Sequence, residues 1–416
     1  MRRWVMATMT ADSRLSPRSG SALRDVIVGS IRHNTKQYTM ILALIAIWLI
    51  FSVLTDGVFI SSRNLSNLFV QTVTTAILAI GMVLVIVTGH IDLSVGSVLG
   101  FAGAVCATLM VKLGWGVLPA IGVTLLTGLA VGAWHGFWVA YRKVPAFIVT
   151  LASMLAFRGL IIGITGGQTQ GLEMAPPHVA EAFKQIGQGY VPTLTAAAQG
   201  EFHDTSALIS LGLIAAVILA GWRRRAARLK FGFAVLPVHL EIARLAFICV
   251  IIAAFSMILV RHLGLPWSVV LMGALAVLFS FIASNTTFGR HLYAIGGNPE
   301  AARLSGIDIA RNTMALFMTM GVVVAIAGIV YTSRLGAATT SAGQNAELDA
   351  IAAAVIGGTS LLGGEGTIIG AVVGALVMAS LDNGMSLMNL DITFQYVIKG
   401  LILLVAVWVD MAQRKR

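Results

Sequence analysis

The sequence predicts an all-α protein that crosses a membrane many times. Of its 416 residues, 57% are hydrophobic and only 11% are charged, whereas soluble domains carry about a quarter charged residues. The mean hydropathy is +0.89, and the apolar residues form long uninterrupted runs. Basic residues gather at the ends of these runs, where they orient helices relative to the membrane. We therefore read the net charge of +11 as a sign of membrane topology and not of nucleic-acid binding.

The apolar runs divide the chain into about ten to twelve membrane segments, because one crossing takes about 20 apolar residues and broken or re-entrant segments take fewer. The predicted segments are residues 40–54, 68–88, 95–111, 117–141, 146–165, 207–222, 243–260, 269–284 and 314–331, a short 351–362 joined to 368–388, and 394–409. The first run lacks a cleavage pattern and is predicted to be a retained span.

The distribution of Lys and Arg predicts that both termini face the cytoplasm. Basic residues cluster in residues 1–38, 223–242 and 285–312, whereas loop 166–205 carries four acidic residues against one lysine. We therefore assign loop 166–205 to the outside and the other three to the inside. Residues 1–38 are predicted to be a disordered arm because they have little to bury. Residues 39–416 are predicted to form one membrane domain.

The polar stretch 285–312 contains a short helix with start and stop signals. Asn298 suits the N-cap, Pro299 the first helical position, and Glu300 the positive end of the helix dipole. Gly306 offers a left-handed stop. A capped helix with basic flanks is suited to contact another protein. The alternative is a hairpin loop that is basic only because it is cytoplasmic.

A second motif, Gly-His-Ile-Asp-Leu-Ser-Val-Gly-Ser, occupies residues 89–97, between two apolar runs. Asp92 and Ser94 are predicted to cap the helix that begins near Val95. For Asp92 the alternative is a place in the wall of a wet pathway, where an unpaired acid is tolerated at membrane depth. His90 is either a pH-sensitive group or a polar neighbour without a role of its own.

Several stretches resemble the permeases of bacterial ABC sugar importers of the ribose, xylose and arabinose type. The resemblance covers nearly all of residues 55–410, and it is closest to the D-xylose branch because of the extra length at 222–244 and the sequence at 379–386. Ala146, where Ser is common, and His90 depart from the family pattern. The stretches that carry the resemblance are residues 92–97, 144–151, 293–307 and 347–353.

The resemblance implies a homodimeric permease subunit in the bacterial inner membrane. It implies import of a monosaccharide, D-xylose first, delivered by a periplasmic sugar-binding protein and driven by a separate ABC ATPase. No catalytic residue, metal or cofactor is implied for this chain, and the partner subunit hydrolyses ATP. Stretch 285–312 is implied to rest in a groove of the ATPase, through the docking residues Gly297, Asn298, Pro299, Glu300, Ala301, Ala302, Arg303 and Gly306.

A hydroxyl-rich neutral solute needs neutral donors and acceptors along its path. Glycine-rich residues 341–366 are predicted to form a broken half-helix of the kind that lines transporter pathways. Each polar side chain could instead bond a neighbouring helix. The candidates for the pathway wall are Gln71, Thr75, Asp92, Ser94, Asn345, Asn383 and Ser386.

Two other function classes fit the sequence less well. An ion-coupled secondary sugar transporter keeps ionisable residues at mid-membrane depth, and the predicted spans contain almost none. A membrane-embedded enzyme would need a catalytic motif, and neither His-Glu-x-x-His nor Gly-x-Ser-x-Gly occurs. The chain also lacks any Gly-Lys dipeptide, so it has no phosphate-cradling Walker loop of its own.

Overall fold

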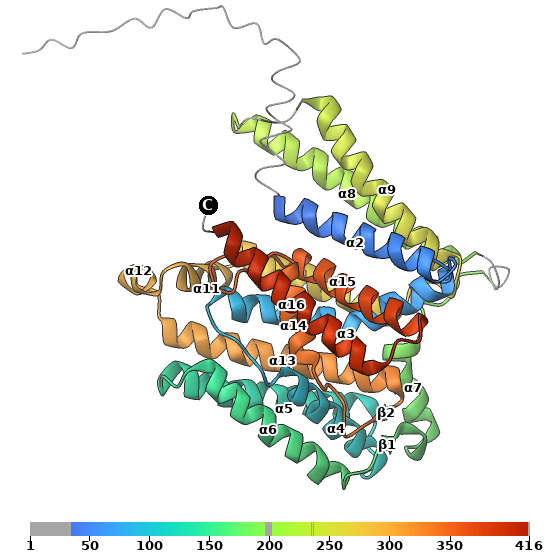
Figure 1. Ribbon diagram of the computed structural model, residues 1–416, viewed down its shortest axis with the longest axis vertical. Helices are drawn as coiled ribbons and strands as arrows, with labels where there is room; N and C mark the ends of the chain where they lie inside the picture. Colours follow the sequence, from blue (N-terminus) through green and yellow to red (C-terminus); the bar gives the residue numbers. More distant parts are fainter. Residues whose placement is uncertain (1–34, 196–201, 234, 236, 415–416) are drawn as a thin grey trace, which may run out of the picture.

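The computed structural model describes residues 35–195, 202–233, 235 and 237–414, which form a bundle of long helices (Figure 1). Among these residues, eight helices are long and apolar enough to span a membrane, and three shorter apolar helices accompany them. The all-α, polytopic prediction is therefore confirmed. The long helices are α3 (Ser62–Val87), α5 (Val117–Gly136), α6 (Ala146–Thr165), α8 (Asp204–Lys230), α9 (Val238–Val260), α10 (Trp267–Asn285), α13 (Ile309–Leu335) and α15 (Ile368–Leu387).

The other helices are shorter or less apolar. Helices α2 (Thr35–Leu54), α4 (Val95–Val111) and α16 (Ile392–Arg414) complete the bundle, and α5 ends in a π-helical turn, Phe137–Tyr141. Helix α2 begins inside the predicted arm 1–38, and residues 1–34 of that arm lie outside the described residues. Four further helices, α7, α11, α12 and α14, are given below with the features that they build.

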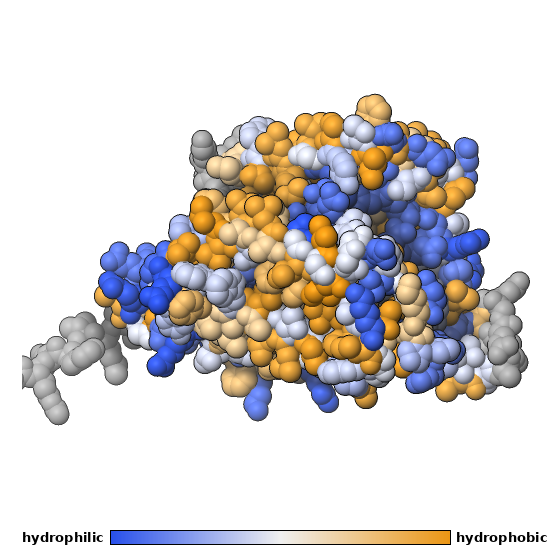
Figure 2. All heavy atoms as spheres, turned by 90° about the horizontal axis from the view of Figure 1, so that it is seen from below, coloured by the Kyte–Doolittle hydropathy of each residue, from blue (hydrophilic) through white to orange (hydrophobic). Residues whose placement is uncertain are grey.

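Helix α3 is the centre of the bundle. It packs against α10, α13, α14 and α15, and between residues 72 and 87 every residue except Thr75 is buried. Between residues 72 and 87 this helix carries no charged residue, so other helices can enclose it without leaving a buried charge unpaired. Elsewhere apolar side chains face outward, and Figure 2 shows them across the middle of one face, with hydrophilic residues toward its left and right ends.

The loop predicted at 166–205 is more structured than expected. It contains strand β1 (Gln170–Gly171), a 3₁₀ turn (Leu172–Met174) and helix α7 (Pro177–Gln188), and β1 pairs antiparallel with β2 (Ala337–Ala338). Helix α7 starts with Pro177 in its first turn and buries Val179 and Phe183. These two residues are four apart and lie on one helix face, which packs against α13. This spacing was the signal that the sequence analysis missed.

The basic segment predicted as a cytoplasmic insertion, 223–242, is mostly helical. Helix α8 continues through the arginines to Lys230, and α9 already begins at Val238. Only residues 231–237 separate the two helices in the sequence, and residues 234 and 236 of these lie outside the described residues. In the other segments the predicted cores agree with the structure, and the helix ends extend into the polar flanks.

Candidate docking surface and transport pathway

Stretch 285–312 folds into two short helices that project from one end of the bundle (Figure 1). We call this the inner end and the opposite one the outer end. The first helix, α11 (Thr287–Gly297), was not predicted, and the second, α12 (Pro299–Leu304), was. Thr286 caps α11 by accepting a hydrogen bond from the Gly289 backbone amide at 3.1 Å. Thr286 is a residue type that favours the N-cap position, so it was a signal in the sequence for the start of α11.

The predicted caps of α12 are confirmed. The side-chain oxygen of Asn298 accepts hydrogen bonds from the backbone amides of Glu300 and Ala301, both at 3.0 Å. Gly306 has a φ of +84°, which is the left-handed stop. Glu300 and Arg303 lie 4.0 Å apart, but both side chains are largely exposed, so this pair adds little stability.

Most of the predicted docking residues are accessible. Gly297, Asn298, Pro299, Glu300, Ala301, Arg303 and Gly306 are exposed, whereas Ala302 is buried and holds α12 against the rest of the stretch. Leu304 was not among the predicted docking residues, yet it is 80% exposed. Leu304 therefore adds an apolar side chain to the accessible surface that the docking residues form.

Helix α11 is joined to the interior of the bundle through backbone groups. The Tyr293 hydroxyl donates a hydrogen bond to the Gly366 carbonyl at 2.7 Å, and burial raises the pKa of this phenol. The Gly364 amide donates to the Val87 carbonyl at 2.8 Å. Gly296 lies against the same carbonyl so closely that a Cβ there would collide with it. A displacement of α11 therefore reaches the end of α3 and the α14–α15 connection directly.

The predicted broken half-helix is present as α14 (Ala346–Ile356), which begins earlier than the predicted segment 351–362. Residues 339–345 lead into it from β2 at the outer end. Along this path, Gly343 lies against Gly96 in the first turn of α4, and Arg158 donates a hydrogen bond to the Ala342 carbonyl at 2.8 Å. Non-helical backbone therefore enters the bundle before α14 begins, an arrangement tolerated where backbone is buried in protein or lines a wet cavity.

Asn345 is the residue at which the entering backbone turns into α14. It has a φ of +62°, is half-buried, and makes no side-chain capping bond. Asn tolerates the left-handed region better than most residues. Its amide is therefore available at the break between loop and half-helix, where transporters commonly bind their substrates.

Two predicted pathway residues lie on one face of α3. Gln71 is exposed and Thr75 is half-buried. Arg63 and Asn67, which the sequence analysis did not single out, are also exposed and continue the same spacing of four toward the outer end. Residues four apart share a helix face, so these side chains form a polar stripe that descends along the otherwise buried central helix.

Asp92 and Ser94 form a closed local turn and do not cap α4 as predicted. One oxygen of Asp92 accepts both from the Ser94 amide, at 2.8 Å, and from the Ser94 hydroxyl, at 2.6 Å. Ser94 makes no side-chain capping bond because its backbone is already helical, with φ −85° and ψ −14°, whereas a capping residue is usually extended. Both side chains are buried, and their place in a pathway wall stays a prediction.

Asn383 and Ser386 lie near the outer end of α15. Asn383 is buried and exchanges two hydrogen bonds with Asn64 of α3, at 2.8 and 3.0 Å, and Asn64 also donates to the Phe59 carbonyl. The pair clamps α3 to α15, which is the alternative that the sequence analysis left open for such residues. Ser386 is exposed. Contact with a solute stays a prediction for both.

A charged cluster joins the last three helices. The Lys399 ammonium of α16 lies 2.8 Å from a carboxylate oxygen of Asp382 in α15 and 3.2 Å from Asp349 in α14. This corrects the premise that the spans contain almost no ionisable residues, because Lys399 lies inside the predicted segment 394–409. Ionisable groups within a membrane usually pair with one another and often mark functional positions.

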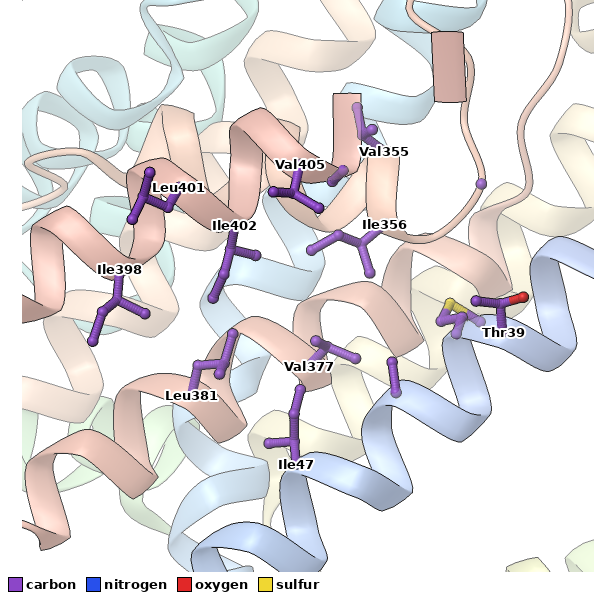
Figure 3. A pocket seen from close by; sticks show the side chains of 14 residues that line it. Thr39, Ile47, Val355, Ile356, Val377, Leu381, Ile398, Leu401, Ile402 and Val405 are labelled. Carbon is purple, nitrogen blue, oxygen red and sulfur yellow. The ribbon is translucent and has the colours of Figure 1, made fainter. Parts of the chain in front are cut away.

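An apolar cavity of about 570 Å³ adjoins this cluster, between α2, α14, α15 and α16 (Figure 3). Leu381 and Ile398 line it, and they directly precede the cluster residues Asp382 and Lys399 in the sequence. The cavity offers a hydroxyl-rich solute almost no hydrogen-bond partners, so it does not suit a sugar. The lining residues are Thr39, Met40, Ala43, Ile47, Val355, Ile356, Gly358, Val377, Leu381, Ile398, Leu401, Ile402, Val405 and Ala406.

Among the described residues, eight helices are long and apolar enough to span a membrane, as expected of a polytopic membrane protein. Residues 64–407 match the family described as the branched-chain amino acid transport system / permease component, and the chain belongs to that family. It is 50% identical over 383 residues to the xylose transport system permease protein XylH of Escherichia coli strain K12, covering 92% of this chain and 93% of that protein.

Other relatives extend the comparison. The xylose transport system permease protein XylH of Haemophilus influenzae is 45% identical over 383 residues, 92% of this chain and 98% of that protein. The ribose import permease protein RbsC of Escherichia coli strain K12 is 33% identical over 387 residues, 92% and 97% of the two chains. No solved structure matches the chain. The resemblance to sugar permeases that the sequence motifs indicated is therefore confirmed.

Proposed function

We propose that this chain is the membrane-spanning permease subunit of an ATP-binding-cassette importer for a monosaccharide, with D-xylose as the preferred substrate. The observation that carries the proposal is the 45–50% identity to xylose transport system permease proteins over 92% of the chain. The ribose import permease is less similar, at 33%. Ribose and related sugars are therefore the first competitors to compare with xylose.

The proposed assembly is a homodimer of this chain in the bacterial inner membrane, with both termini in the cytoplasm. Two copies of a separate ABC ATPase would supply the energy, and a periplasmic sugar-binding protein would deliver the substrate. The proposal rests on the family and on the distribution of basic residues, which favours the cytoplasm for the inner end. ATP would be bound and hydrolysed by the partner, and this chain would hold no cofactor.

The surface proposed to dock the ATPase is the exposed side of α12 together with Leu304. The seven exposed docking residues surround this tip, and the caps of Asn298 and Gly306 fix the helix in the free subunit. A surface that is already ordered loses less conformational entropy on binding. Movement of the ATPase would then pass through α11, by the hydrogen bond from Tyr293 to the Gly366 carbonyl and by the close contact of Gly296 with the Val87 carbonyl.

The proposed sugar pathway runs between the polar stripe of α3 and the entering backbone at 339–345. Beyond the cationic Arg63 at its outer end, the stripe supplies the amides of Asn67 and Gln71 and the hydroxyl of Thr75, and the backbone break supplies Asn345. These groups are neutral donors and acceptors, which suit an uncharged polyol. Displacement of α3 and of the α14–α15 connection by α11 would change the distance between the two sides of this pathway.

The cluster around Lys399 favours one alternative, an ion-coupled secondary transporter, because such proteins use buried charges as relays. Two carboxylates on one lysine also suit a purely structural role, which is to tie half-helix α14 to α15 and α16. We favour the structural role, since the family is one of transport-system permease components. The two functions differ in their source of energy, and an uptake measurement separates them.

The test is sugar uptake into vesicles that hold this chain together with its ATPase and sugar-binding protein. The proposal predicts uptake of D-xylose that requires all three proteins and ATP, and weaker uptake of D-ribose and L-arabinose. Uptake by this chain alone, driven by a proton gradient, would overturn it in favour of the secondary transporter. Equal uptake of all the sugars would retain the importer and refute the preference for xylose.

A further inference from the structure

The helical pair α8–α9 has its own surface chemistry, separate from the proposed pathway and docking surface. The two helices pack mainly on each other, and only 6% of the apolar stretch of each is buried. Figure 1 shows them at the edge of the bundle, beyond α2 and away from α11 and α12. The rest of the described chain therefore leaves most of the surface of this pair uncovered.

The inner turn of this pair concentrates positive charge. Residues 223–244 contain six Lys and Arg residues and a single acidic residue. Arg223, Arg224, Arg228 and Lys230 are exposed. The acid, Glu241, has a side chain only 13% exposed and lies 3.9 Å from Arg244. The exposed surface of the turn is thus strongly cationic.

Aromatic side chains accompany these charges. Trp222 is 42% exposed, Phe231 72% and Phe233 62%, and they lie immediately before and after the basic residues. Exposed aromatic residues gather at the boundary between the apolar core of a membrane and its headgroups. Basic clusters that follow a membrane helix directly are attracted to anionic lipid, by about 1 kcal/mol for each Lys or Arg near the surface.

A protein partner is the competing explanation for the charge. The proposed docking tip α12 projects farther out of the inner end than α8 and α9 do (Figure 1). The basic turn therefore lies nearer to the level at which the helices end, which is the level of the headgroups. Its exposed aromatic residues also suit an apolar boundary better than an aqueous protein surface.

We propose that the inner turn of α8–α9, residues 222–233, is a binding surface for the headgroups of anionic phospholipids. The cationic side chains contact the lipid phosphates, while Trp222, Phe231 and Phe233 insert among the upper acyl carbons. Arginine suits this task because its planar guanidinium can donate two parallel hydrogen bonds to one phosphate. The pair anchors the permease among anionic lipids at a position remote from the sugar pathway.

The test uses the full chain in phosphatidylcholine membranes with and without phosphatidylglycerol, and counts the phosphatidylglycerol molecules retained after extraction by native mass spectrometry. The test variant carries Arg223→Gln, Arg224→Gln, Arg228→Gln and Lys230→Gln. Each neutralised residue should lower the affinity for phosphatidylglycerol roughly fivefold, and high salt should weaken retention by the unmodified protein. A charge-preserving control carries Arg223→Lys, Arg224→Lys and Arg228→Lys. This control should retain most of the bound phosphatidylglycerol.

Two outcomes would overturn the proposal. The first is equal retention of phosphatidylglycerol by the Gln variant and the unmodified protein. The second is that the Gln variant loses binding of the ATPase in membranes of pure phosphatidylcholine, which would assign the turn to a protein partner. The salt dependence of the unmodified protein tests the proposal even where the Gln variant inserts poorly, since salt-independent retention contradicts it.

Discussion

Two basic regions lie at the inner end of this permease, and they differ in how they are joined to the bundle. In stretch 285–312, α12 is capped at both ends, the Tyr293 hydroxyl donates a hydrogen bond to the Gly366 carbonyl, and Gly296 lies against the Val87 carbonyl. The inner turn of α8–α9 carries more charge but belongs to a helical pair that is little buried. Positive charge alone therefore does not distinguish a docking surface from a lipid contact. In our proposals, the attachment of α11 to the interior of the bundle is what separates the docking surface from the lipid-binding surface.

This comparison has a counterpart in the last three helices, where Lys399 ties α16 to α14 and α15. Lys399→Leu should have the largest effect, since it leaves Asp349 and Asp382 facing each other without a cation. Breaking a buried ion pair from one side costs about 3–5 kcal/mol. We expect a lower unfolding temperature in detergent and loss of uptake. Lys399→Arg is the matched control and should retain most of the unfolding temperature and most of the uptake. If the Leu variant is as stable as the unmodified protein, the cluster does not stabilise the contact between α14, α15 and α16.

The attachment of α11 is tested next by adding one methyl group at Gly296. A Cβ at this position would collide with the Val87 carbonyl, whereas at Gly273 of α10 it would meet nothing within 4 Å. Overpacking of this kind costs about 1–3 kcal/mol. We expect Gly296→Ala to lower sugar uptake per ATP hydrolysed and Gly273→Ala to leave it nearly unchanged. If the two variants behave alike, the contact with α3 does not transmit movement.

A smaller effect is expected for Tyr293→Phe, which removes the hydrogen bond to Gly366 and little else. The loss should be about 0.5–1.5 kcal/mol, seen as faster hydrogen exchange in α11. Because burial raises the pKa of Tyr293, folding favours the neutral phenol. This contribution to stability is complete below the phenol's ordinary pKa and disappears as the pH rises through the raised value. The check is an ultraviolet titration of the tyrosines in both proteins. The unmodified protein should contain one tyrosine that ionises at higher pH and is absent from the Phe variant. Identical titration curves would refute the raised pKa of Tyr293.

The sequence predicted the membrane segments well because a bilayer imposes a strong compositional signal on each span. The caps of α12 were predictable because they are local. Asn298 and Gly306 each bond or bend the backbone within a few residues of their own position. Lys399 was missed because one charge in an apolar run has no visible partner until α14, α15 and α16 are brought together. Ser94 was predicted to cap α4, but its backbone conformation assigns its hydroxyl to Asp92 instead.

The most direct test of the account is Ala301→Arg in the reconstituted importer, measured as ATP hydrolysis and D-xylose uptake in the same vesicles. Ala301 is exposed on α12, so an arginine should fold without strain and obstruct only a partner. The matched control is Lys184→Arg on α7, at the outer end of the bundle. We predict that Ala301→Arg lowers uptake at least tenfold and separates it from ATP hydrolysis, with normal insertion. Full uptake by this variant would contradict the assignment of α12 as the surface that receives the force of the ATPase.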